Sequence, residues 1–215
     1  MREIVIQEIL KGKIIAIVRG VEPEKAQKVA QALYEGGIRM VEVTFNQKDP
    51  SSFEKTAQAI RLICETMGEK MLVGAGTVTS TALVDIAAKA GAGYIISPDT
   101  DVEVIRHTRE LGLVSIPGAY TATEAKQAHN AGADFIKLFP CIADAPAYVK
   151  ALCAPFNHMR FLAVGGVNAD NAAAFLKAGA VGVGVGGSLV NKAWVDAGEY
   201  WKITEEAKKF IENIK

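Results

Sequence analysis

The sequence predicts an α/β fold, a closed (β/α)8 TIM barrel that spans residues 1–215 as one domain and begins with a short N-terminal helix. Three observations predict it. An amphipathic helical segment, a glycine-containing bend and a short apolar run recur eight times along the chain. No linker interrupts this recurrence, and 215 residues lie near the short end of the length range for the barrel. A doubly wound open sheet is the alternative arrangement of the same units.

The predicted strands are short runs rich in β-branched and other apolar residues. They are nearly continuous apolar runs, which is typical of parallel strands buried on both faces. In chain order they cover residues 13–18, 40–44, 71–74, 94–97, 114–117, 135–138, 160–164 and 181–185.

The predicted helices have marked ends. Proline, or Ser, Thr, Asp and Asn residues that can cap a first turn, indicate helix starts at 22–23, 49–52, 79–80, 121–124 and 168–170. Glycine follows several helical segments, because it takes the left-handed backbone of a helix C-cap most readily. These glycines are Gly36, Gly37, Gly91, Gly112, Gly132 and Gly179.

The composition excludes several classes of protein. Lys plus Arg equal Asp plus Glu at 24 each, so no net charge favours nucleic acid or an anionic membrane as a partner. The least polar stretch, 178–190, is too short to cross a bilayer. The first ten residues mix charged and apolar side chains, which does not fit a signal peptide. We expect neither a nucleic-acid partner nor a membrane partner.

The cysteines and histidines indicate the compartment and the absence of a metal. Cys64, Cys141 and Cys153 are an odd number without CxxC spacing, which argues for free thiols in a reducing, cytoplasmic compartment. The three histidines also lack the spacing of metal ligands. We therefore expect no metal and no cofactor.

The barrel prediction indicates where the function lies, because the active sites of such barrels lie at the C-terminal ends of the strands. Polar side chains are found at several of these ends. They are Arg19, Glu42, Thr44, Thr77, Ser97, Asp99 and Lys137, and glycine-rich loops follow the last two strands.

Lys137 interrupts the apolar run 134–140, so its side chain either reaches solvent or lies desolvated. Desolvation disfavours the ammonium form and lowers the pKa, which leaves a neutral amine that can attack a carbonyl carbon. Glu42 is likewise a charge among apolar neighbours on another strand. The pair can be a Schiff-base lysine with its general acid/base, or a salt bridge in the barrel core.

The loops after strands seven and eight are predicted to bind phosphate, since glycine lets an oxyanion approach the backbone N–H groups. They contain Gly165, Gly166, Gly186, Gly187 and Ser188. The alternative is that these glycines only form tight turns. The run 182–187 also matches GxGxxG, but it lies in the last strand and too little chain follows for a dinucleotide-binding unit.

Two further side chains are candidates for binding a substrate carboxylate. Arg19 ends strand one, where a guanidinium can hold a carboxylate bidentately. Thr77 follows strand three, where its hydroxyl can donate a hydrogen bond. Their alternatives are a solvated surface arginine and a cap for the helix that begins near Thr79.

Several of these segments together resemble a known family, the class I aldolases that cleave 2-keto-3-deoxy-6-phosphogluconate and 4-hydroxy-2-oxoglutarate. The Lys-Leu-Phe-Pro run and the Glu-Val-Thr strand carry most of the resemblance, and the likeness extends in order through most of the chain. The matching segments are 15–19, 36–45, 74–78, 96–98, 116–118, 135–140, 165–167 and 186–190. The resemblance implies a (β/α)8 barrel without a metal, usually a homotrimer.

The resemblance also implies roles for individual residues. Lys137 would form the Schiff base and Glu42 would shuttle protons. Thr77 would bind the pyruvyl carboxylate, Pro98 and Phe139 would line the pocket, and Gly165, Gly166 and Ser188 would hold the phosphate end of the substrate, together with Gly187 in the same loop. The chain departs from the pattern at Asn46, where an arginine is common, at Val164, where a threonine is common, and at Asp99, where a glycine is common.

The expected function is therefore the reversible cleavage of a 2-keto-4-hydroxy acid to pyruvate and an aldehyde through an imine on Lys137. The partners are small molecules: the keto acid, pyruvate and the aldehyde. Two alternatives belong to other classes. One is a sugar-phosphate isomerase or epimerase that uses Glu42 as a base, and the other is a non-catalytic binding protein on a degenerate aldolase barrel.

Overall fold

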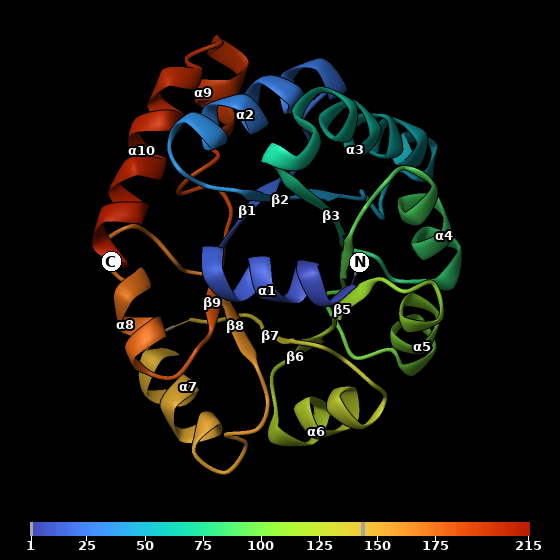
Figure 1. Cartoon of the computed structure of the whole chain (residues 1–215), viewed down its shortest axis with the longest axis vertical. Coiled ribbons are helices and arrows are strands. Elements are labelled where there is room, and N and C mark those ends of the chain that lie inside the picture. The colour runs from blue at the N-terminus through green and yellow to red at the C-terminus, as the bar shows by residue number, and fades with distance from the viewer. Residues whose placement is uncertain (1, 143–144) are drawn as a thin grey trace.

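The computed structural model describes residues 2–142 and 145–215, and the predicted barrel is confirmed there (Figure 1). Its centre is a sheet of nine strands, counted over those residues, and all of its strand pairs are parallel. The strands are β1 Ile14–Val18, β2 Met40–Thr44, β3 Leu72–Gly76, β4 Tyr94–Ile96, β5 Val114–Ile116, β6 Gly118–Ala119, β7 Ile136–Leu138, β8 Phe161–Val164 and β9 Gly182–Val185.

Helices alternate with the strands and surround the barrel, as Figure 1 shows in the view along its axis. They are α1 Arg2–Gly12, α2 Pro23–Glu35, α3 Phe53–Met67, α4 Thr81–Lys89, α5 Val102–Glu110, α6 Ala122–Asn130, α7 Ala145–Cys153, α8 Ala172–Lys177, α9 Lys192–Ala197 and α10 Tyr200–Asn213, with 3-10 turns η1 Pro50–Ser52 and η2 Gly68–Lys70. Within the described residues, no helix is both long enough and apolar enough to cross a bilayer.

The fifth strand, predicted at 114–117, ends at Ile116 as β5, and a further short strand, β6, follows Pro117, which is why nine strands form an eightfold barrel. β5 pairs with β4, β6 pairs with β7, and Pro117 lies between them. Proline has no N–H to donate, so the ladder is interrupted at that residue. The segment still closes the barrel, because Lys137 N–H donates to the Pro117 carbonyl at 2.9 Å and Phe139 N–H donates to the Ala119 carbonyl at 3.1 Å.

Most of the predicted helix starts agree with the structure. Ser80 caps α4, Thr121 and Glu124 form a capping box at α6, and α2 begins at Pro23. The start predicted at 168–170 is also marked by a cap, although regular helix α8 begins at Ala172: the Asn168 carbonyl accepts the Ala172 N–H at 3.0 Å. The Asn168 side chain accepts the N–H groups of residues 170 and 171, both at 3.0 Å, as an N-cap side chain does.

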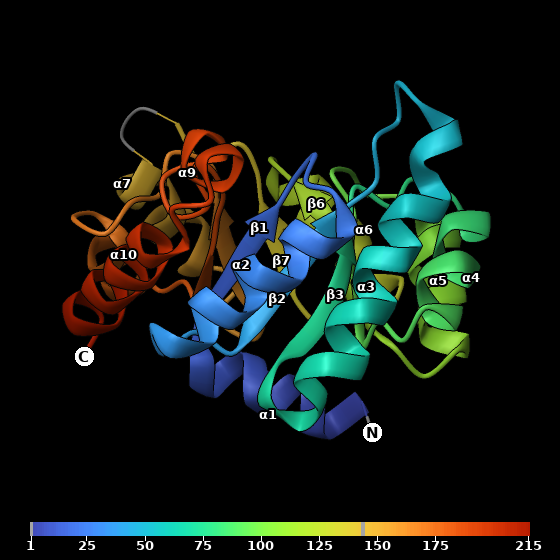
Figure 2. The same ribbon diagram turned by 90° about the horizontal axis from the view of Figure 1, so that it is seen from above.

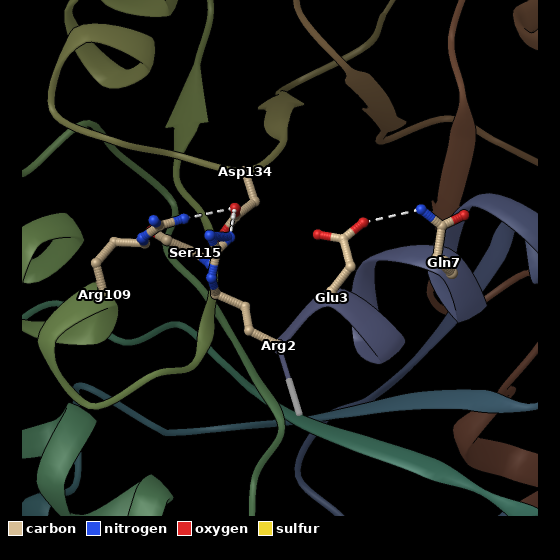
Figure 3. A network of polar contacts seen from close by, with 6 residues as sticks. All are labelled: Arg2, Glu3, Gln7, Arg109, Ser115 and Asp134. Atoms are coloured by element: carbon tan, nitrogen blue, oxygen red, sulfur yellow. Dashed lines mark hydrogen bonds and ion pairs between the residues drawn. The ribbon is translucent and has the colours of Figure 1, made fainter.

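The N-terminal end of the barrel is closed by α1, which lies across it beneath the strands (Figures 1 and 2). Val5, Ile6 and Ile9 of α1 are buried in a cluster with residues of the barrel interior. An ionic network fixes the start of the helix (Figure 3): Asp134 accepts hydrogen bonds from Arg2 and Arg109, both at 2.6 Å. It also accepts the N–H of Ser115 at 3.0 Å. The packed end leaves the opposite end of the barrel for a site.

Candidate active site

Strands on opposite sides of the barrel carry Lys137 and Glu42. Lys137 is the middle residue of β7 and Glu42 the middle residue of β2, and β1, β9 and β8 lie between these strands in the sheet. Both side chains are buried, with 7% of Lys137 and 2% of Glu42 exposed. Lysine and glutamate are rarely so buried without a partner. Their burial therefore points to a specific arrangement at the barrel mouth.

The two groups do not form a closed salt bridge. No ion pair of 4.0 Å or less joins them in the part of the chain that the structure describes. Neither head group hydrogen-bonds to a described residue. Every described polar side-chain atom that is sealed from solvent does have a partner, so these head-group atoms are not sealed. The carboxylate oxygens and the amine nitrogen therefore reach open space, and their hydrogen-bonding capacity is free for a ligand.

Burial shifts the pKa values of both groups toward neutrality. It lowers the pKa of the Lys137 amine; the Glu42 charge partly opposes that shift and the Arg19 charge adds to it. Burial likewise raises the pKa of the Glu42 carboxyl, against the opposing charges of Lys137 and Arg19. A larger fraction of the lysine is thus a neutral nucleophile, and the carboxyl can more readily accept and return a proton near neutral pH.

Glycine at position 76 makes the position of Glu42 possible. Gly76 is the last residue of β3, and a Cβ added there would overlap the Glu42 carboxyl group. Only a residue without a side chain leaves that volume to the acid. We did not predict this role from the sequence. A signal was available, since Gly74 and Gly76 lie in one strand, where glycine often marks a close approach by another group.

Arg19 and Thr77 lie together at the mouth. The Arg19 guanidinium donates to the Thr77 hydroxyl oxygen at 3.3 Å, so the threonine hydrogen stays free to donate. The Thr77 N–H also has no acceptor within residues 2–142 and 145–215. The two residues thus offer several donors at one place, which suits a carboxylate.

A cavity of about 390 Å³ adjoins Arg19 and Phe139 and is lined by the two glycine-rich loops. The N–H groups of Gly165, Gly166, Gly187 and Ser188 have no acceptor among the described residues. The Ser188 hydroxyl donates to the Val167 carbonyl at 2.7 Å, so it links the two loops, and its N–H is the donor left for a ligand. This cavity can receive an oxyanion through backbone amides.

Phe139 connects this cavity to the lysine, because the Lys137 amine lies 4.8 Å from the centre of the Phe139 ring. Val164 lines the same cavity and presents only apolar atoms to it. Arg19 also lines a neighbouring cavity of about 400 Å³ together with Asn46. The cavity at the glycine-rich loops therefore combines an apolar wall, one guanidinium and unpaired amides.

The other predicted site residues lie elsewhere at the mouth. Pro98 follows β4 and is half-buried, with its carbonyl against Gly118, and it does not line the glycine-loop cavity. Asp99 is exposed overall, but the carboxyl group is partly desolvated. This desolvation, and then the negative charge of Asp101, raise the pKa of the carboxyl. A larger cavity of about 730 Å³ lies near α1 and holds none of the predicted residues. Within the described residues, no three His, Cys, Asp or Glu side chains gather as metal ligands.

Known proteins resemble this chain over most of its length. The model of the family "KDPG and KHG aldolase" matches residues 5–206. A 2-dehydro-3-deoxy-6-phosphogalactonate aldolase of Escherichia coli K12 is 38% identical over 180 residues, which is 83% of this chain and 85% of that protein.

Two solved structures have the same fold at appreciable identity. The KDPG aldolase of Legionella pneumophila, with pyruvate captured as a covalent carbinolamine, has a TM-score of 0.81 and 25% identity and covers 94% of this chain and 96% of its own. A cube-shaped protein cage, designed by fusing symmetric oligomeric domains, has a TM-score of 0.83 and 35% identity and covers 94% of this chain and 72% of its own.

Proposed function

Because the chain belongs to the KDPG and KHG aldolase family, we propose that Lys137 is its imine-forming lysine and that Glu42 moves the protons of the reaction. Membership makes the protein a class I aldolase, a lyase that cleaves 2-keto-3-deoxy acids through a Schiff base. The observation that carries the assignment is the buried pair, because both side chains reach open space without pairing to each other.

The reaction begins with the neutral Lys137 amine, which attacks the C2 carbonyl carbon of the keto acid and forms a carbinolamine. Glu42 as an acid gives a proton to the C2 hydroxyl, and water leaves as the protonated imine forms. Glu42 as a carboxylate then accepts the proton of the C4 hydroxyl. The C3–C4 bond breaks, the aldehyde departs, and the bonding electrons move into the imine to give an enamine.

The second half of the reaction restores the enzyme. The enamine takes a proton at C3 and becomes the imine of pyruvate. Water adds to C2, pyruvate leaves, and Lys137 is a free amine again. Throughout, Arg19 and Thr77 hold the carboxylate, so that the carbonyl carbon stays beside the amine.

For the distal end of the substrate we propose a phosphate, bound by the amides of Gly165, Gly166, Gly187 and Ser188. The unpaired N–H groups and the adjoining Arg19 support an anion in that cavity. Phe139 and Pro98 would then border the carbon chain. A panel of 2-keto-3-deoxy-6-phosphogluconate, its C4 epimer and 4-hydroxy-2-oxoglutarate, assayed for pyruvate release, identifies the substrate. A preference for 4-hydroxy-2-oxoglutarate, the one acid of the three without a phosphate, would contradict the phosphate assignment.

Reduction by borohydride in the presence of pyruvate tests the assignment of Lys137. We expect a stable adduct on the peptide that contains Lys137, found by mass spectrometry. Lys137→Arg keeps the charge but cannot form an imine, so no adduct should remain, whereas Lys89→Arg on the exposed side of α4 should still be labelled. An unlabelled wild-type protein, or an adduct on another lysine, contradicts the proposal.

Lys137→Arg also separates the aldolase from an isomerase or epimerase. The comparisons do not favour a sugar-phosphate isomerase or epimerase. Such an enzyme would retain turnover in Lys137→Arg, because it needs no imine. A degenerate binding protein would release no pyruvate from any acid in the panel.

For the assembly and the compartment we propose a homotrimer in a reducing environment. The similarity to a domain used in a symmetric oligomeric cage supports an oligomer. The exposed apolar side chains of Tyr120, Ile142 and Trp201 provide surface that association could cover. Three free cysteines are consistent with reducing conditions. Light scattering should give three times the 22.9 kDa of one chain, about 69 kDa.

A further inference from the structure

Thr77 has a backbone conformation that is unfavourable for its side chain. Its φ is +56°, in the left-handed region, where β-branched residues are rarely found. Such a conformation persists only when the surrounding contacts determine it, and it is concentrated at functional sites. The Thr77 hydroxyl lies beside the Arg19 guanidinium, and its N–H has no acceptor among the described residues, so the contacts that hold this backbone also decide where those two donors lie.

Gln47 supplies two of those contacts from a different loop. Its Nε2 donates to the Thr77 carbonyl at 2.7 Å, and the Thr79 hydroxyl donates to its Oε1 at 3.1 Å. One planar amide thus binds the chain on both sides of Val78. Val78 itself is held from the other side, since its N–H donates to the Ile96 carbonyl at 3.2 Å.

The base of Gln47 is fixed as well. Asn46 forms a turn in which its carbonyl accepts the Asp49 N–H at 3.0 Å and its side chain accepts the Lys48 N–H at 3.2 Å. The preceding residue, Phe45, donates its N–H to the Gly76 carbonyl at 2.9 Å, directly before Thr77. A long side chain on a fixed turn can therefore transmit a defined position to its partner.

From this geometry we infer that Gln47 is a positioning residue for substrate binding: its amide holds Thr77 in the left-handed conformation that aims the Thr77 donors at the substrate carboxylate. The inference rests on the proposed function. It assigns Gln47, which touches none of the reacting atoms, an effect on carboxylate recognition and not on imine formation as such.

Three variants separate the two bonds of the amide. Gln47→Met keeps the length of the side chain and removes both hydrogen bonds. Gln47→Glu can still accept from Thr79 but cannot donate to the Thr77 carbonyl. Thr79→Val removes only the Thr79 bond. Gln31→Met is the matched control, because Gln31 is also exposed and donates to Glu35 at 2.8 Å on a distant helix.

The measurement is borohydride trapping at Lys137 with pyruvate and, separately, with methyl pyruvate, which lacks the carboxylate. In Gln47→Met and Gln47→Glu the pyruvate concentration for half-maximal trapping should rise about tenfold, with an unchanged maximal yield. The value for methyl pyruvate should stay at the wild-type level. Thr79→Val should show a smaller rise, and Gln31→Met none. With the cleavable substrate, KM should rise by a larger factor than kcat falls.

Two results would overturn the inference. One is a half-maximal pyruvate concentration in Gln47→Met within about twofold of the wild type. The other is an equal loss for pyruvate and methyl pyruvate, which indicates a general structural role. If the wild-type protein itself traps no pyruvate, the proposed function fails and the inference fails with it. Trapping by the wild type together with an unaffected Gln47→Met overturns the inference alone.

Discussion

At the scale of single residues, the proposed chemistry depends on two buried groups, Lys137 and Glu42, that do not pair with each other. Desolvation lowers the pKa of the Lys137 amine and so raises the fraction of the amine that is neutral. The Glu42 charge opposes that shift and the Arg19 charge adds to it. The Glu42 and Arg19 charges therefore shift the pKa of the Lys137 amine in opposite directions.

This balance predicts opposite pH shifts in two variants. Removing the Glu42 charge in Glu42→Gln should lower the Lys137 pKa, because the carboxylate favours the ammonium form. Removing the Arg19 charge in Arg19→Gln should raise it. The rate of borohydride trapping rises with pH as the amine deprotonates, so the rising limb should move to lower pH in Glu42→Gln and to higher pH in Arg19→Gln. Shifts in the same direction would contradict the charge balance.

Gly76→Ala tests the space required by the acid. The added methyl group would overlap the Glu42 carboxyl, so we expect the carboxyl to be displaced and kcat to fall by about a hundredfold. Overpacking should also lower the free energy of unfolding by about 1–3 kcal/mol. Gly93→Ala is the control, since its nearest neighbour is the flexible end of Leu72 at 3.2 Å. Near-normal kcat in Gly76→Ala would show that Glu42 does not need that volume.

At the scale of elements, helix α1 is tied to the barrel at the end opposite the candidate site. Asp134 accepts bonds from Arg2 of α1, from Arg109 of α5 and from the N–H of Ser115 in β5, so one carboxylate joins three elements. Its side chain is 6% exposed, which shields these bonds from solvent. The segment that contains Ser115 continues through Pro117 to β6, next to β7 and its lysine.

The apolar face of α1 carries a prediction of its own. Ile9 is fully buried in the barrel interior, so Ile9→Ala should lower the free energy of unfolding by about 2–5 kcal/mol. Ile4 lies on the same helix but is 68% exposed, and Ile4→Ala should stay within about 0.5 kcal/mol of the wild type. Urea titration of both variants checks the pair. Equal effects would show that α1 does not seal the barrel.

At the scale of the whole molecule, the parallel barrel brings loops from distant parts of the chain to one mouth. Arg19, Glu42, Thr77, Lys137 and Ser188 come from five different βα units, and the strand order places them around a single axis. The same closure buries two ionisable groups, Glu42 and Lys137, and burying a charge costs free energy unless the charge is paired. We therefore expect the barrel to retain them for the proposed reaction and not for its stability.

Replacing both groups by apolar residues should separate function from stability. In the double variant Glu42→Leu/Lys137→Met no buried charge remains, so the free energy of unfolding should equal the wild-type value or exceed it by about 1–3 kcal/mol. No pyruvate should be released. The single variant Glu42→Leu keeps the buried lysine and serves as the comparison. A double variant that is less stable than the wild type would mean that the two groups stabilise the barrel.

The sequence by itself determined the recurrence of helix, bend and strand, and with it the barrel. Buried parallel strands read as apolar runs, and glycine and capping residues mark where each element ends. It also singled out Lys137, because a charge in such a run is visible without any structure. The matching segments at residues 15–19, 36–45 and 135–140 pointed to the family, since they carry the polar residues of the strands.

Only the tertiary structure decided which groups meet. The pairing of β5 with β4 and of β6 with β7 on either side of Pro117, and the volume that Gly76 leaves to Glu42, follow from contacts between elements. Gln47 reaches Thr77 across 30 positions of sequence. Local propensity acts over a few residues. Strand register and barrel closure, by contrast, determine which distant side chains lie next to each other. No pattern within one segment contains that information.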